Sequence, residues 1–119
     1  MKEGRITMGK NIINSGEFVK HPKEEGVYMK HFFCSSDNDR LNNLEVIIDS
    51  GCEISPHIHD NSSEFYYVIS GFGEFLTEGK WMPFKVGDAL KAPIGMEHGI
   101  KNTGNDKIIV FSTFSPAIR

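Results

Sequence analysis

The sequence predicts an all-β fold. Short runs of strand-forming residues recur along the chain, and turn residues such as Gly, Asp and Asn separate them. Gly (12 residues) and Phe (9 residues) are abundant, while no window of about ten residues shows a helical period. We count about eight or nine short strands, which is typical of a β-sandwich or barrel.

The first expected strands are defined by composition. Residues 27–33 are rich in Val, Tyr and Phe, whereas the polar residues 35–43 predict a surface loop. Residues 44–48 form the next apolar run, which ends at the turn-forming sequence Asp49-Ser50-Gly51. The most apolar run, 65–70, predicts a buried strand.

The later strands are bounded by clear turn signals. Residues 74–78 alternate between apolar and polar and break at Gly79-Lys80, which predicts a hairpin. Pro83 lies within 81–86, so this segment is expected to be an edge strand or irregular. Shorter strands are expected at 88–92 and 99–102, and a last apolar strand at 108–114.

The length of 119 residues and the mass of 13.4 kDa predict one domain. We expect residues 27–119 to form a single barrel. Residues 1–26 have a mixed composition, and Pro22 makes a helix there unfavourable. We expect this N-terminal segment to act as an edge strand or as an arm in a dimer.

Composition excludes several classes of partner. Thirteen Lys and Arg residues against sixteen Asp and Glu residues give a net charge of −3. Nucleic acids and anionic membranes select basic faces, so neither is expected as a partner. No apolar stretch approaches the roughly 20 residues of a membrane span. Cys34 and Cys52 do not resemble a disulfide framework, so we expect a reduced, cytoplasmic protein.

Three histidines and one glutamate suggest a metal site. On a strand, the side chains of His57 and His59 point to the same face, so both imidazoles can reach one ion. Glu64 follows a short turn, and His98 lies on a separate expected strand. Three imidazoles and one carboxylate suit one divalent transition metal, which can be Fe, Mn, Ni, Cu, Co or Zn.

The spacing of these residues resembles the two sequence motifs of the cupin superfamily. The first motif consists of Gly51, His57, His59, Glu64 and Gly71. The second consists of Gly87, Pro93, Gly95, His98 and Asn102. The two motifs match without a departure, are separated by the short spacer 72–86, and cover about half of the chain. The sequence is therefore identified as a small single-domain cupin of the bacterial type.

This resemblance implies a double-stranded β-helix, also called a jelly-roll barrel, with a metal in an enclosed pocket. Cupins include dioxygenases, decarboxylases, isomerases and lyases that act on small organic acids. Four protein ligands leave open positions on an octahedral metal, and the net positive charge of the site attracts an anion. We expect an enzyme that acts on a small anionic metabolite, with oxygenase or isomerase/lyase chemistry.

Two other functions remain open. A non-catalytic module would bind a small molecule or a metal without turnover, and a metal-free barrel would be purely structural. Tyr66 shares strand parity with Glu64, so its hydroxyl is a candidate proton donor or substrate anchor, or else the ring only fills the barrel. His21 and His31 have no partner pattern, and Asn102 is expected to bond turn backbone.

We also expect a homodimer, because small cupins commonly pair and a short barrel has sheet edges to protect. Four residues of the first expected strand are candidates for the contact, or else fill the core: Tyr28, Met29, Phe32 and Phe33.

Overall fold

The computed structural model describes residues 6–7, 11–14 and 16–119. Within these ranges the chain forms twelve strands and no helix, which confirms the all-β prediction. No helix of the described residues is long and apolar enough to cross a membrane. Part of the expected N-terminal segment, namely residues 1–5, 8–10 and 15, lies outside the described residues.

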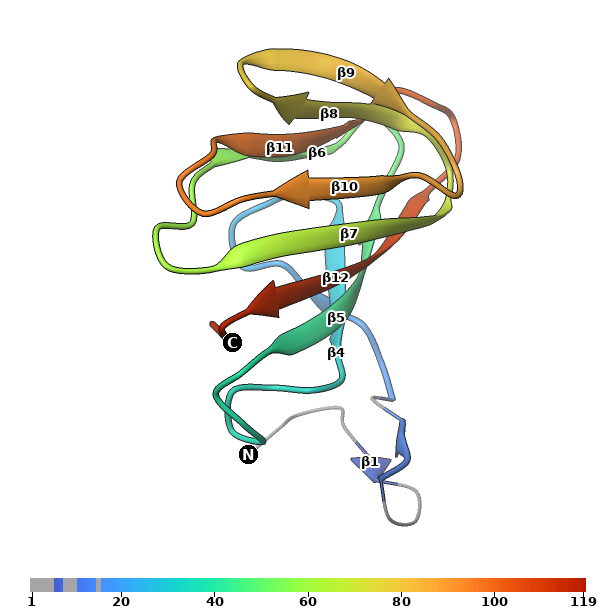
Figure 1. The fold of residues 1–119 in the computed structure, drawn as a ribbon. Coiled ribbons are helices and arrows are strands. Elements are labelled where there is room, and N and C mark those ends of the chain that lie inside the picture. The colour runs from blue at the N-terminus through green and yellow to red at the C-terminus, as the bar shows by residue number, and fades with distance from the viewer. Residues whose placement is uncertain (1–5, 8–10, 15) are drawn as a thin grey trace.

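Two antiparallel sheets pack face to face and form the barrel (Figure 1). The larger sheet has the order β10 (Ala89–Ala92), β7 (Ser63–Ser70), β12 (Ile108–Ser115), β5 (Asn42–Ile48), β4 (Val27–His31) and β3 (Val19–Lys20). The smaller sheet has the order β6 (Glu53–His57), β11 (His98–Asn102), β8 (Gly73–Thr77) and β9 (Lys80–Phe84). A separate ribbon pairs β1 (Ile6–Thr7) with β2 (Ile13–Asn14).

The core lies between the two sheets, and strand alternation decides which residues enter it. Along β7, Tyr66 and Val68 point inward on the same face as Glu64, whereas Phe65 and Tyr67 point outward. This burial pattern confirms the predicted strand parity. Both sheets contribute to one hydrophobic cluster, which includes Val46, Val68 and Val110 from the larger sheet and Phe75 and Ile100 from the smaller one.

The predicted hairpin and edge strand are both confirmed. Strands β8 and β9 are joined by the two-residue turn Glu78-Gly79, since Thr77 pairs with Lys80. Both turn residues have positive φ, at 50° and 78°, as a tight hairpin requires. Strand β9 contains Pro83 and lies at the edge of the smaller sheet, where the missing backbone N–H costs no ladder bond.

Some predicted boundaries were wrong. The first long strand ends at His31 rather than at residue 33, and β5 begins at Asn42, inside the segment expected to be a loop. Asn42 is fully buried opposite Phe114 of β12, so pairing and packing override the weak strand propensity of asparagine. Strand β6, which leads into the histidine pair, was not recognised by its composition.

Asn102 is a structural residue, as predicted. Its side-chain amide donates to the carbonyls of Ile48 and Asp106, both at 2.9 Å, and its carbonyl accepts the N–H of Gly104 at 3.0 Å. The residue is buried and joins the end of β11 to the end of β5. Cys34 and Cys52 are both free thiols.

Candidate metal centre

Four side chains from different elements converge at one end of the barrel. His57 ends β6, His59 follows in the loop, Glu64 is the second residue of β7, and His98 begins β11. One ligand atom from each of the four lies within 4.8 Å of the others, so the group could hold a metal ion. The ring centroids of His57 and His98 are 4.3 Å apart because the two residues face each other across paired strands.

The position of His59 differs from the prediction in one respect. The strand ends at His57, so the two rings do not converge through strand alternation alone. Instead, the carbonyl of His59 accepts the N–H of Gly95 at 2.9 Å, which ties the loop to the corner before His98. The centroids of His57 and His59 are still only 4.8 Å apart.

Backbone carbonyls orient two of the imidazoles. His57 Nδ1 lies 2.7 Å from the carbonyl oxygen of Ser55, and His98 Nδ1 lies 2.9 Å from that of Met96. A carbonyl oxygen only accepts, so each Nδ1 carries the proton and each Nε2 is left to face the centre of the group. This arrangement, in which the distal N–H of the ring is held by a carbonyl, is common among metal-binding histidines.

Glu64 is the one carboxylate of the group and is 6% exposed. Ser112 donates to its Oε2 at 2.6 Å, while its Oε1 faces the Nε2 of His98 at 3.1 Å and that of His59 at 3.3 Å. Burial opposes ionisation, but these contacts and the hydroxyl of Tyr66 outweigh it and lower the pKa of Glu64 to about 2. The carboxylate is therefore ionised in the folded protein.

The buried Nε2 of His59 has no hydrogen-bond partner among the residues that the structure describes, although Glu64 Oε1 is 3.3 Å away. The contact is close but poorly aligned, so we treat it as electrostatic rather than as a hydrogen bond. A buried ring nitrogen without a partner is costly unless something else occupies its lone pair. The donor set therefore fits a divalent transition metal, because such an ion accepts electron pairs from all four side chains.

Tyr66 lies next to the site on the inward face of β7, two residues after Glu64. It is 2% exposed, and its ring lies edge-on to that of His98 with centroids 6.3 Å apart. Burial, together with the neighbouring Glu64 carboxylate, raises the pKa of Tyr66 well above its usual value. The phenol is therefore neutral and retains its proton.

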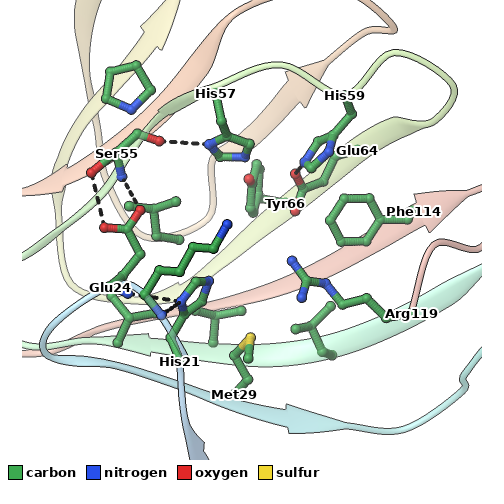
Figure 2. A pocket seen from close by; sticks show the side chains of 16 residues that line it. His21, Glu24, Met29, Ser55, His57, His59, Glu64, Tyr66, Phe114 and Arg119 are labelled. Atoms are coloured by element: carbon green, nitrogen blue, oxygen red, sulfur yellow. Dashed lines mark hydrogen bonds and ion pairs between the residues drawn. The ribbon is translucent and has the colours of Figure 1, made fainter.

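The group opens into a cavity of about 240 Å³ (Figure 2). His57, His59, Glu64 and Tyr66 line its inner part, while His98 does not line it. The ring of Phe114 stands beside that of His59, with centroids 5.0 Å apart. The remaining wall is formed mainly by apolar side chains: Val27, Met29, Leu44, Val46, Ile54 and Pro56.

Sequence reasoning missed the residues at the mouth of this cavity. His21, Lys23 and Glu24 come from the N-terminal segment, and Arg119 comes from the other end of the chain. No periodic pattern marks these positions, and only the folded chain brings them together. His21 is not one of the metal-site residues, as predicted: its Nδ1 accepts the backbone N–H groups of Lys23 and Glu24, each at 3.0 Å.

Two other missed residues follow from register. Ser112 lies opposite Tyr66, and Phe114 lies opposite Glu64, across the pairing of β12 with β7. The alternation of the 108–114 run places both side chains on the inward face, so the signal was present. The register that sets them beside Glu64 is not visible in the sequence.

Comparisons with known proteins agree with this architecture. The family described as the Cupin domain matches residues 44–114, more than half of the chain. Among curated proteins, the chain is 40% identical over 55 residues to an "Oxalate-binding protein" of Thermotoga maritima, which covers 46% of each chain. The chain thus spans about half the length of this relative.

Solved structures with the same fold cover more of the chain. The structure of KdgF from Halomonas sp. has a TM-score of 0.75 and 27% identity, and the match covers 86% of this chain and 89% of that one. A predicted oxalate decarboxylase from Thermotoga maritima has a TM-score of 0.74 and 27% identity, with 84% and 90% covered. These likenesses confirm the expected double-stranded β-helix.

The geometry predicts the titration of His98 in metal-free protein. Burial lowers the pKa of His98, but the Glu64 carboxylate and the Met96 carbonyl raise it above the usual 6.5. The contribution of this raised pKa to the stability of the folded protein is complete below pH 6.5 and is lost as the pH rises through the folded-state pKa of His98. The substitution Glu64→Gln removes the negative charge, so the His98 pKa should fall below 6.5.

Imidazole nitrogen shifts followed by NMR across this pH range measure the change. The ring of His31, which is outside the group, serves as the internal control. An unchanged titration of His98 in the Glu64→Gln variant would contradict the assigned contact.

Proposed function

We propose that this chain, which belongs to the cupin family, is a metal-dependent enzyme that acts on a small anionic metabolite. The proposed ligands are His57, His59, Glu64 and His98. The observation that carries this proposal is the convergence of these four ligand atoms around the unpartnered Nε2 of His59. The substrate class follows from charge, since a divalent ion beside one carboxylate leaves a net positive site.

A bound divalent metal would supply Lewis-acid chemistry, and also redox chemistry if it is iron or copper. The chain's own residues prepare the site for this. Ser55 and Met96 fix the rings of His57 and His98, and Ser112 holds one oxygen of Glu64, so the other oxygen faces the imidazoles. The apolar walls of the cavity limit water around a bound acid, which strengthens electrostatic interactions there.

Metal analysis tests the metal site. Protein purified without an affinity tag is expected to hold about one equivalent of Fe, Mn, Ni, Cu, Co or Zn. The His57→Ala/His59→Ala double variant should lose it, because half of the donor set is removed. The matched control is His31→Ala, which lies outside the group and should retain the metal. Equal metal content in the double variant and the control would contradict the assignment, as would wild type that stays empty after anaerobic reconstitution.

We propose that Tyr66 supplies a proton during the reaction or anchors the substrate through its hydroxyl. Its neutral phenol lines the cavity beside Glu64, which supports this role. Two classes of reaction on small acids fit such a site: oxygenation, and isomerase or lyase chemistry. Hydrolysis fits less well, because the sequence shows no separate nucleophile motif.

Turnover tests the enzymatic role. Metal-loaded protein should consume at least one member of a panel of small carboxylic acids followed by NMR. The Tyr66→Phe variant should retain its metal but lower kcat by a factor of about 10²–10⁴, the usual contribution of general acid–base catalysis. If the variant retains both kcat and KM, Tyr66 has neither role and serves packing alone.

The alternative is a module that binds a small acid without turnover. The relative named as an oxalate-binding protein favours this alternative. Wild-type protein that binds carboxylates at its metal but consumes none of the panel would establish the alternative over the enzyme.

We also propose a homodimer through the outer face of the larger sheet. Phe65, Tyr67 and Ile69 of β7 are each more than 40% exposed there. Phe111 of β12 pairs with Tyr67, and the ring of Phe32 lies 6.1 Å from that of Phe111, so they extend the same patch. Phe32 was an expected contact, whereas Met29 lies in the core. A contiguous apolar patch is typical of an interface, and a second copy covers it symmetrically.

Sedimentation velocity tests the dimer across a wide concentration range. Wild type should sediment as a dimer, and Tyr67→Lys should sediment as a monomer because two charges would be buried at the two-fold interface. Met82→Lys replaces an exposed apolar residue on β9 of the smaller sheet and is the control. A monomeric wild type would rule the proposal out.

A further inference from the structure

The cavity has a cationic mouth in addition to the histidine–glutamate group. Arg119 lines the same cavity as His57, His59 and Glu64, and Figure 2 shows its side chain turned toward the cavity beside Phe114. The guanidinium carbon lies 5.8 Å from the centre of the Phe114 ring. Lys23 also lines the mouth, so two cationic side chains lie there.

The guanidinium of Arg119 has no carboxylate partner among the residues that the structure describes. Within the described part of the chain, two acidic side chains line the cavity, and both are engaged elsewhere. Glu24 accepts the backbone N–H of Ser55 at 2.8 Å and its hydroxyl at 3.0 Å, and Glu64 belongs to the histidine group. An arginine that faces a cavity without a partner is well suited to bind a carboxylate, because its donors match that geometry.

The backbone that carries Arg119 is held in place. The fully buried Asn42 accepts the N–H groups of Ile118 and Arg119 with its Oδ1, at 2.7 Å and 3.4 Å. The carbonyl of Arg119 accepts the N–H of Ser35. These bonds hold the backbone at Arg119, so less conformational entropy is lost when an anion binds.

The positive charge of Arg119 also affects the pKa values of His21 and Tyr66. Burial lowers the pKa of His21, and the positive charge of Arg119 is the next cause of that shift. For Tyr66, burial and Glu64 raise the pKa, while Arg119 acts in the opposite direction. The guanidinium therefore acts electrostatically on both the mouth and the inner part of the cavity.

We propose that the site selects a small dicarboxylic acid. One carboxylate binds at the histidine–glutamate group, and the other pairs with Arg119. The cavity of about 240 Å³ is lined by His57, His59 and Glu64 and also by Arg119, so one small acid can contact both ends. Apolar side chains such as Val46 and Phe114 form most of the remaining wall and suit its methylene chain. This inference rests on the proposed function, since the first carboxylate binds at the metal.

Calorimetric titration of zinc-loaded protein with succinate and succinamate tests it. The two probes have the same size, and an amide replaces one carboxylate in succinamate. Wild type should bind succinate at least tenfold more tightly, because a charge-assisted pair with Arg119 is replaced by a neutral hydrogen bond. Arg119→Gln should reduce this ratio to below about twofold. Arg40→Gln, at an exposed arginine outside the cavity, should keep the wild-type ratio.

The zinc content of each sample is measured in parallel and reports on the proposed function alone. Three results would overturn the inference while leaving a filled metal site intact. Wild type could bind succinate and succinamate equally well, Arg119→Gln could keep the wild-type ratio of the two affinities, or neither probe could bind. Wild type without zinc would contradict the proposed function instead. In that case the affinities for succinate and succinamate are compared on the zinc-free protein. A ratio of these affinities that falls in Arg119→Gln supports the role of Arg119, and an unchanged ratio contradicts it.

Discussion

Glu64 places an ionised carboxylate inside the barrel, and the rest of the site is organised around this charge. A buried charge is strongly unfavourable unless hydrogen bonds or opposite charges compensate it. Here Ser112 bonds one oxygen, and two imidazoles approach the other. Without a metal, the Glu64 carboxylate raises the pKa of His98, which favours a second proton on that ring. A divalent metal would take the place of that proton, and the four side chains that would hold it include His59, whose Nε2 has no partner among the described residues.

The two-sheet architecture explains why this charge can be held in a small domain. Strand β7 belongs to the larger sheet, and β6 and β11 belong to the smaller one, so Glu64 and the histidines converge from both sheets at one end of the barrel. The core behind it is packed with aliphatic residues from both sheets. Because the site and the core share the same strands, the positions of the four side chains depend on strand register.

The sequence predicted the fold class and most strands, and it singled out the four residues that the structure brings together as a candidate metal site. Each of these depends on local pattern or fixed spacing. Glycines and prolines mark the turns, and the spacing of the histidines and the glutamate along the chain can be recognised without knowing how the core packs. Strand β6 and the start of β5 were missed, because Asn42 and the histidine pair lack strand-forming composition and gain their structure from pairing. The mouth of the cavity was missed for a stronger reason: Lys23 and Arg119 come from opposite ends of the chain and meet only through tertiary structure.

X-ray absorption spectroscopy at the edge of the bound metal tests the central claim most directly, because it observes the ligands themselves. The account predicts a first shell of nitrogen and oxygen atoms at about 2.0–2.2 Å with the multiple-scattering pattern of about three imidazoles. It also predicts that Glu64→Gln alters this shell, since the only carboxylate of the group is removed. A shell of oxygen atoms alone, or one with a single imidazole, would contradict the claim that these four side chains close on one ion.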